Sequence, residues 1–397
     1  IILLSYFFME FKYKVTMAAL IGCISIYGIT SSLLTPLISI ILEHKKVNTT
    51  IIGGMAMIAP AGLILGAFFV SKIMRSLAGR QLLISGIVFE IVLIIALMQT
   101  QSIVLWFLLR FFGGFADSIL FVVTETWLIE ITPREKRGKI MGFYNSIMMM
   151  SFALGPLILT FSGSRGILPF LICILLMIFA AFPLFWTDKF LPKALEKPSF
   201  NIISFIIVAP LLASACFVVA FQDLAIASLL PVYGLRVGMT ESSATLMLFF
   251  GVAGGALLQF PIGWAADKLG TRRLLVACSF VGLIGTLVWP FVITKTMLLW
   301  TTLFIWWGFF AGVSTISMIL AGNWFRGSEL STAMAAYGVF WGIGAFLGPF
   351  TGGAMMDIWD PYGFPLTLIT VSGIFFIFSL IPWFYKLPKM KTSYRKN

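Results

Sequence analysis

Twelve long apolar runs dominate this sequence, and each is close to the length that a helix needs to cross a membrane. They occupy residues 15–42, 50–71, 81–99, 102–128, 139–162, 166–187, 200–232, 242–266, 273–293, 296–320, 329–356 and 363–385. A spanning α-helix takes about 20 apolar residues. Within hydrocarbon the backbone polar groups must pair inside the protein, which leaves helices or closed barrels. The alternating strands of about ten residues that a barrel needs are absent. The sequence therefore predicts an all-α integral membrane protein with twelve transmembrane helices.

Composition and charge placement agree with this class. The chain is 60% hydrophobic and only 11% charged, which is too apolar for a soluble domain. The net charge of +12 need not indicate a nucleic-acid partner, because most Lys and Arg residues fall on the side that carries both termini. By the positive-inside rule this side is cytoplasmic. We expect a multi-pass protein of the cell inner (plasma) membrane, with a lipid bilayer around it and no nucleic acid bound.

Three pairs of short matches indicate an internal repeat. The segments at 34–36, 80–83 and 154–156 resemble those at 229–231, 272–275 and 347–349, in the same order and at nearly the same separation. This pattern predicts two six-helix halves. The expected divisions are a cytoplasmic N-terminus at 1–14 with its true start at Met9, an N-terminal bundle at 15–187, a cytoplasmic linker at 188–199, a C-terminal bundle at 200–385 and a basic cytoplasmic tail at 386–397.

A basic loop lies between the eighth and ninth apolar runs, where one helix must end and the next begin. It reads Gly-Trp-Ala-Ala-Asp-Lys-Leu-Gly-Thr-Arg-Arg over 263–273. A glycine can supply the turn, and basic residues hold such a loop on the cytoplasmic side. At Gly263 a neighbouring helix could approach closely. We expect a gating loop here, made of Gly263, Asp267, Lys268, Gly270, Arg272 and Arg273.

This loop resembles the G-x-x-x-D-R/K-x-G-R/K-R/K signature of the major facilitator superfamily (MFS). The segment Glu125-Thr-Trp-Leu also resembles one in the bacterial YcaD-like branch of that family, in which Ser takes the place of Thr126. The resemblance implies two six-helix halves, a substrate site at the membrane midplane and a cavity lined by helices 1, 4, 7 and 10. The first half carries a degenerate loop signature, with Ser71 and Arg75 at the positions of Gly263 and Asp267.

The fourth run carries charges at membrane depth. Arg110 and Asp117 are seven residues apart and share a helix face, and such charges are costly unless they pair or meet water. Arg110-Phe-Phe-Gly-Gly114 resembles the R-x-x-Q-G signature of proton-coupled antiporters, with Gly113 in the Gln position. Either the two residues couple protonation to gating, or they form a buried structural pair. Asp223 in the seventh run is the third candidate for proton coupling, and no Arg lies within that run at 200–232. It is expected to carry the proton, unless it is only a polar residue satisfied by neighbouring helices.

Further candidates line the expected cavity or bend its helices. Trp306 and Trp307 either form a substrate wall or serve packing, and Glu90 receives no function from the sequence. His44 is the single histidine. We interpret it as a loop residue, and the alternative is a pH sensor. The substrate-cavity set is Tyr27, Gln222, Trp306 and Trp307. The expected helix-bend set is Gly155, Pro156, Gly344, Gly348, Pro349, Gly352 and Gly353.

The eleventh run carries the antiporter signature G-x-x-x-G-P-x-x-G-G, which the family places in helix 5. In the fifth run of this chain Leu159 and Thr160 replace its last two glycines. This departure favours an uptake carrier, whereas the Arg110 signature favours an antiporter.

No enzymatic or metal-binding pattern appears. The four cysteines lie inside apolar runs without metal-ligand spacing, and phosphate-binding, zinc-protease and serine-hydrolase motifs are absent. We expect neither an enzyme nor a cofactor. The main reading is a secondary active transporter, a monomer that exports a small molecule in exchange for protons. The alternatives are an uptake carrier, as symporter or uniporter, and a transport-dead sensor on the same fold.

Overall fold

The computed structural model describes residues 2–74, 77–133, 137–187, 205, 208–325 and 328–385. Among them are twelve helices long and apolar enough to cross a membrane. In the first half these are α1 (Ile2–His44), α2 (Thr49–Ile73), α3 (Gly79–Gln99), α4 (Ile103–Ile131), α5 (Arg137–Ser162) and α6 (Leu168–Ala181), which the 3-10 helix η2 (Phe182–Trp186) continues. In the second half they are α8 (Pro210–Arg236), α9 (Glu241–Leu269), α10 (Thr271–Val288), α11 (Thr296–Trp324), α12 (Ser328–Ile358) and α13 (Gly363–Leu380).

The predicted twelve-helix fold is confirmed, with local differences at helix starts. Helix α1 begins at Ile2 rather than near residue 15, because neither Gly nor Pro interrupts the sequence before Gly22. Helix α8 begins at Pro210, where proline suits the first helical turn because its missing N–H would lack a helical partner anyway. The predicted linker at 188–199, the tail at 386–397 and Arg75 lie outside the described residues.

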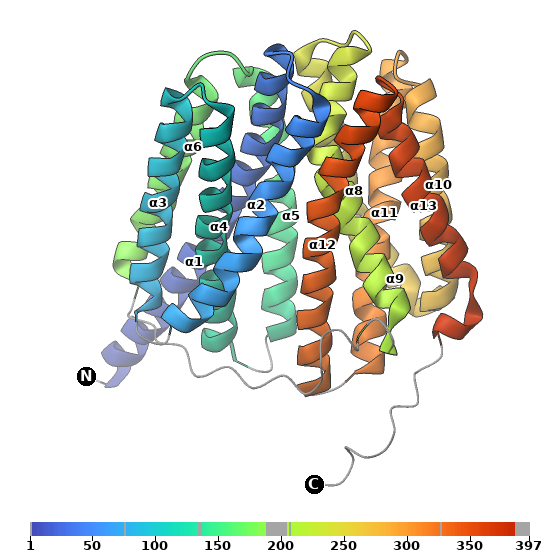
Figure 1. Cartoon of the computed structure of the whole chain (residues 1–397). Coiled ribbons are helices and arrows are strands. Elements are labelled where there is room, and N and C mark those ends of the chain that lie inside the picture. The colour runs from blue at the N-terminus through green and yellow to red at the C-terminus, as the bar shows by residue number, and fades with distance from the viewer. Residues whose placement is uncertain are drawn as a thin grey trace.

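The helices form two bundles side by side, one made of α1–α6 and the other of α8–α13 (Figure 1). Within the halves, α2 packs on α4 and α9 packs on α11. Across the halves, α2 packs on α12 and α5 packs on α9. Helix α1 begins and α13 ends at the same end of the molecule (Figure 1). The opposite end, which carries the loops after α1, α3, α5, α8, η3 and α12, is called the distal end below.

Glycines bring α2 and α4 into backbone contact. A Cβ at Gly114 would collide with the carbonyl oxygen of Ala59, and one at Gly62 would collide with that of Phe111. Small residues at such crossings allow the close packing that holds membrane helices together where no hydrophobic force acts between them. This packing fixes the height and rotation of α4, the helix that carries Arg110 and Asp117.

We therefore expect Gly114→Ala to destabilise the first half. The added methyl group must push α4 away from α2, and overpacking of this kind costs about 1–3 kcal/mol. Thermal unfolding of the purified protein, followed by tryptophan fluorescence, should show a lower melting temperature. Gly22→Ala is the matched control, because a Cβ at Gly22 would have no neighbour within 4 Å. Equal melting temperatures for the two variants would contradict this account of the α2–α4 contact.

Candidate functional site

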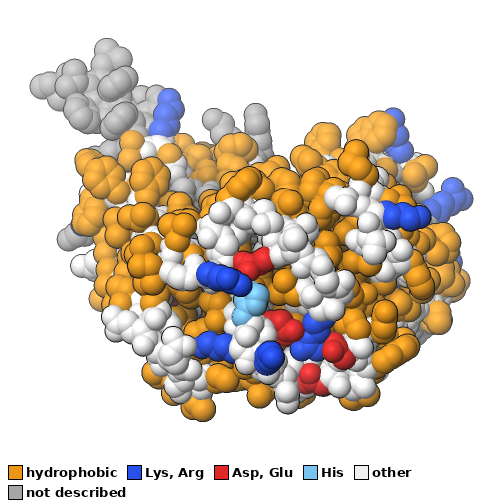
Figure 2. All heavy atoms as spheres, turned by 90° about the horizontal axis from the view of Figure 1, so that it is seen from above, with side chains coloured by type: hydrophobic (Ala, Val, Ile, Leu, Met, Phe, Trp, Pro, Cys, Tyr) orange, Lys and Arg blue, Asp and Glu red, His pale blue; other side chains and the backbone are white. Residues whose placement is uncertain are grey.

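Charged side chains gather in one area of the distal face, from its middle toward one edge, while apolar side chains cover much of the rest (Figure 2). Three groups of polar contacts there join the two halves. In each group, a residue of α1, α2, α5 or the α5–α6 loop contacts a residue of the second half.

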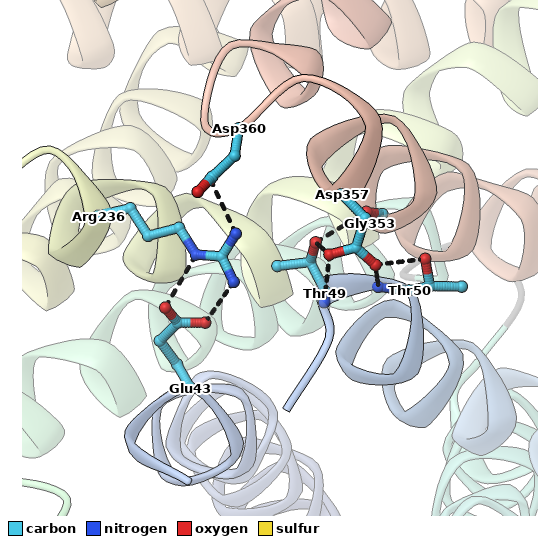
Figure 3. Close-up of polar contacts among 7 residues, drawn as sticks. All are labelled: Glu43, Thr49, Thr50, Arg236, Gly353, Asp357 and Asp360. Atoms are coloured by element: carbon cyan, nitrogen blue, oxygen red, sulfur yellow. Dashed lines mark hydrogen bonds and ion pairs between the residues drawn. The ribbon is translucent and has the colours of Figure 1, made fainter. Parts of the chain in front are cut away.

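Arg236 is the centre of the first group (Figure 3). Its guanidinium donates from Nε to Glu43 Oε1 over 2.8 Å and from Nη2 to Glu43 Oε2 over 3.0 Å. A further bond of 2.8 Å runs from Nη1 to Asp360 Oδ1. The two-pronged geometry matches a planar guanidinium to a carboxylate, which makes such pairs strong and directional. The last turn of α8 is thereby tied to the last turn of α1.

Asp357 of α12 makes the second group by capping α2 from the other half (Figure 3). The backbone N–H groups of Thr49 and Thr50 donate to its two carboxylate oxygens over 2.9 and 2.8 Å, and both hydroxyl groups donate as well. The first N–H groups of a helix have no partner within the helix. A carboxylate at that position satisfies them and is favoured by the helix dipole.

Glu241 at the start of α9 makes the third group. Its Oε1 accepts a hydrogen bond from the backbone N–H of Ser164 over 2.5 Å, and its Oε2 lies 3.2 Å from His44 Nε2. Thr160 and Thr245 add a hydroxyl contact of 2.8 Å between α5 and α9. His44, expected to be a loop residue, thus lies at the end of α1 and bonds across the halves. Together the three groups join the two halves at the distal end.

Sequence reasoning missed Glu43, Arg236, Asp357 and Asp360. Each lies at a helix end beside a short loop, where a charge is unremarkable. One signal was available. Arg236 is a basic residue on the predicted external side of the membrane, where the positive-inside rule predicts few Lys and Arg residues. Its partner could not be inferred, because Glu43 is far away in the sequence and lies in the other half.

The predicted gating loop lies at the opposite end and joins α9 to α10. Gly270 has a φ of +83°, which a glycine adopts without strain and which lets α10 begin at Thr271. Lys268 lies over the ring of Trp264 at 3.9 Å, and Arg272 lies 5.3 Å from the ring of Tyr385. Arg273 is exposed. The side chain of Asp267 is outside what the structure describes.

Gly263 makes no unusually close helix contact. The atom nearest to a Cβ built there is Thr315 Cγ2, at 3.9 Å, which is ordinary van der Waals contact. The gating role of the whole set stays a prediction.

Arg110 and Asp117 lie together in the interior of the first half, 6% and 9% exposed. Arg110 Nη2 donates to Thr35 Oγ1 of α1 over 3.4 Å. Both residues interact electrostatically with Glu90 of α3, and Tyr27 of α1 adds its hydroxyl group to the same cluster. The structure thus adds Glu90, to which the sequence assigned no function, to the two predicted residues.

Asp223 forms the polar centre of the second half. Its Oδ1 accepts a hydrogen bond from Trp307 Nε1 over 3.1 Å, which links α8 to α11. The neighbouring Gln222 points instead toward α13, where it donates to Ser372 Oγ over 2.5 Å. The structure therefore brings Asp223 and Trp307 together and directs Gln222 away from them.

The remaining cavity candidates are tightly packed. Trp306 is 1% exposed, stacks on Trp289 with ring centroids 6.0 Å apart, and covers Gly285 of α10. Tyr27 is 7% exposed and meets Phe152 of α5 edge-on. Elsewhere, α2, α4 and α12 line an open apolar groove of about 480 Å³, with residues such as Phe68, Phe111 and Phe346.

The predicted helix-bend residues lie at helix contacts. Gly155 meets the α1 backbone at Ile29, and Gly344 and Gly348 meet the α8 backbone at Phe217 and Phe221. Gly353 meets Thr49 of the other half, and Gly352 packs on Leu229 and Phe364. Helices α5 and α12 continue through Pro156 and Pro349. Close packing at these glycines is observed, and bending stays a prediction.

Metal binding finds no support in the described part of the chain. No three His, Cys, Asp or Glu side chains there form a group that could hold an ion. The four cysteines are buried and unpaired, as small residues at membrane helix contacts often are.

Comparison with known proteins gives a family match over most of the chain. The model of the Major Facilitator Superfamily matches residues 20–319 and, in a second match, 212–397. The uncharacterised MFS-type transporter YfkF of Bacillus subtilis is 27% identical over 367 residues, which cover 89% of this chain and 92% of the relative. The uncharacterised MFS-type transporter YcaD of Escherichia coli O45:K1 is 25% identical over 186 residues, covering 46% of this chain and 48% of that protein.

Solved structures agree on the fold. The nucleoside transporter NupG, crystallised as a point mutant, superposes with a TM-score of 0.77 at 12% identity, over 94% of this chain and 100% of the other. A D-xylose-proton symporter superposes with a TM-score of 0.76 at 13% identity, over 95% and 98% of the two chains.

The distal contacts predict how the protein responds to the loss of Arg236. Arg236→Gln removes the bonds to Glu43 and Asp360, and hydrogen bonds to a charged group contribute about 1.5–3 kcal/mol. If these bonds form only when the distal end is closed, the population should shift toward a distally open state. Spin labels on Val104 and Met297, which lie at the distal ends of α4 and α11, should then show a longer distance component.

The control for this measurement is Lys295→Gln. It removes a basic, exposed side chain from the same end and leaves the Arg236 bonds intact. An unchanged distance distribution in Arg236→Gln would show that these bonds do not hold the distal end closed.

Proposed function

The chain belongs to the major facilitator superfamily of membrane transporters, and we propose that it exports a small molecule by alternating access in exchange for protons. The observation that carries the proposal is the presence of acidic groups at membrane depth in both halves. Asp117 accompanies Arg110 in the first half, and Asp223 bonds to Trp307 in the second. Ionisable residues inside a membrane are costly, so their presence favours a proton or substrate pathway.

Alternating access requires a state closed at one end, and the distal contacts support that part of the proposal. With both termini in the cytoplasm, as the charge distribution favours, the distal face is external. The structure then corresponds to a state closed to the outside. The gating loop at 263–273 is proposed to close the cytoplasmic side in the other state, when the distal bonds are broken.

The proposed roles follow the sequence prediction with one refinement. Asp223 is the proton carrier, and Asp117 with Arg110 forms its partner site. Trp307 lies next to Asp223 and is the best supported member of the substrate cavity, followed by Tyr27. Gln222 and Trp306 pack within their own half, so we propose that they support the cavity wall. Neither a cofactor nor a second subunit is needed for this transport cycle.

Uptake of a small solute is the second candidate function. It is favoured by Leu159 and Thr160, which stand where the antiporter signature has glycines. Leu159 is buried, and Thr160 bonds to Thr245 of α9, so this part of α5 contributes side chains where the signature has none. One of the solved structures with this fold is named as a symporter. Transport assays in vesicles of both orientations separate the two directions.

Asp223→Asn should uncouple transport from the proton gradient. An asparagine still accepts the bond from Trp307 but cannot carry a proton, so we expect binding and downhill exchange to remain while accumulation against a gradient is lost. The measurement is a substrate screen in proteoliposomes with and without an imposed pH gradient. Asp117→Asn should chiefly lower thermal stability, because it removes a carboxylate that compensates the buried Arg110.

Asp223→Glu is the control, because it keeps a titratable group at this position and should retain some coupling. Accumulation or expulsion of substrate by Asp223→Asn against a gradient, under a proton-motive force, would rule out Asp223 as the carrier.

Asp267→Asn tests the proposed gating loop. The variant should fold and insert normally but bias the conformational cycle, because the carboxylate is expected to stabilise the state closed at the cytoplasmic side. Transport rate at matched expression is the readout, with insertion checked by size-exclusion chromatography. A normal rate in this variant would remove Asp267 from the mechanism.

A further inference from the structure

Glu90 of α3 is a buried acid that neither the family signatures nor the predicted proton sites account for. It lies midway along a helix that runs from Gly79 to Gln99 and is only 4% exposed. Among the described residues, its Oε2 atom has no hydrogen-bond partner. An ionised carboxylate in such a buried position is far more costly than a neutral acid, because a charge loses most of its solvation when it is taken out of water.

The position of Glu90 relative to α4 is specific. A Cβ built on Gly113 would lie 3.7 Å from Glu90 Oε2 and 3.8 Å from Oε1. Arg110, Gly113 and Asp117 are three and four residues apart, so they share one face of α4. Because Gly113 has no side chain, there is space beside it for the Glu90 carboxyl group. Along the axis of α4, this space lies between Arg110 and Asp117.

Four groups interact electrostatically with Glu90 from the surrounding helices. They are Arg110 and Asp117 on α4, Tyr27 on α1 and Cys173 on α6. Only Arg110 is a cation, and it forms no direct ion pair with either acid in the described part of the chain; it donates to Thr35 instead. One buried guanidinium can balance one carboxylate. A second ionised carboxylate would be uncompensated, so the pair of acids should hold one proton between them, as closely spaced carboxyl groups do.

We propose that Glu90 is a proton-binding site, which shares one proton with Asp117 beside Arg110 inside the first half. This proposal rests on the proposed proton-coupled function and adds a residue from α3 to it. In the distally closed state Glu90 holds the proton. Ionisation of Glu90 requires that water reach its carboxyl group, or that Arg110 turn toward it from one helical turn away. Whether Glu90 keeps its proton thus depends on how closely α3 packs against α4.

Infrared spectroscopy of the purified protein tests this directly, because it detects the C=O stretching band of a protonated carboxylic acid. Difference spectra between acidic and alkaline pH should contain such a band in the wild type, to which each protonated acid contributes. Glu90→Gln should lose one component of the band, whereas Glu125→Gln, which removes another carboxyl group from the same bundle, should keep that component. Asp117→Asn should shift the titration of the band to lower pH, because a neighbouring negative charge opposes ionisation. A band that persists unchanged in Glu90→Gln overturns the proposal.

A second pair of variants keeps the test valid if Glu90→Gln does not fold. Gly113→Ser places a hydroxyl donor next to the Glu90 carboxyl group, and Gly113→Ala adds only the methyl carbon. Because a donor stabilises the charged form, the band should titrate at lower pH in Gly113→Ser than in Gly113→Ala. Equal titration in the two variants would mean that the titrating acid does not lie at Gly113.

The infrared result and the transport assay can fail independently. If Asp223→Asn still drives transport against a gradient while the acid band depends on Glu90, the assignment of Asp223 as proton carrier is wrong and the Glu90 site stands. If the band is the same in the wild type and in Glu90→Gln while transport is proton-driven, the Glu90 site is wrong and the transport function stands.

Discussion

The cost of an unpaired charge in hydrocarbon accounts for the placement of nearly every charged group in the described structure. Basic side chains of the predicted gating loop lie at the end of the molecule where α1 begins, and Lys268 and Arg272 rest there on aromatic rings. Arg236 is mostly surrounded by protein, with its side chain 19% exposed, and meets two carboxylates. Arg110, at membrane depth, lies among two acids and a tyrosine. The deeper a cation lies, the more of its compensation comes from residues on other helices.

The same constraint explains why the distal end is closed by so few residues. The first N–H groups of a helix have no hydrogen-bond partner within the helix. In α2, Asp357 of the other half accepts hydrogen bonds from two of these groups. Opening this end exposes these groups to water, which can replace the carboxylate. The closed and open states can therefore be close in free energy, although the closed state has several strong bonds. That balance is what a transporter needs in order to cycle.

The sequence was sufficient for the spans, the two halves and the family, because apolar run length and the loop at 263–273 are local signals. Helix starts were less certain: α1 extends to Ile2 since nothing in its sequence interrupts a helix. Pairings between the halves, such as Glu43 with Arg236, could not be predicted from the sequence, because no local pattern specifies which helix ends meet. Glu90 was named from the sequence, but no function was assigned to it. Its significance depends on the space beside Gly113, and only the packing of α3 on α4 shows it.

The location of the acids limits how protons can be coupled to movement. Glu90, Asp117 and Arg110 all belong to one half, and Asp223 and Trp307 both belong to the other. A rocking motion of two rigid halves leaves the distances within each half unchanged, so it cannot break these contacts directly. What rocking does change is the set of bonds across the distal end and the access of water to the space between the halves. In the proposed mechanism, proton release therefore follows from hydration of the acids, and Arg110 and Trp307 are the local groups that favour or oppose it. Under this proposal, coupling depends on which acid water can reach in which state.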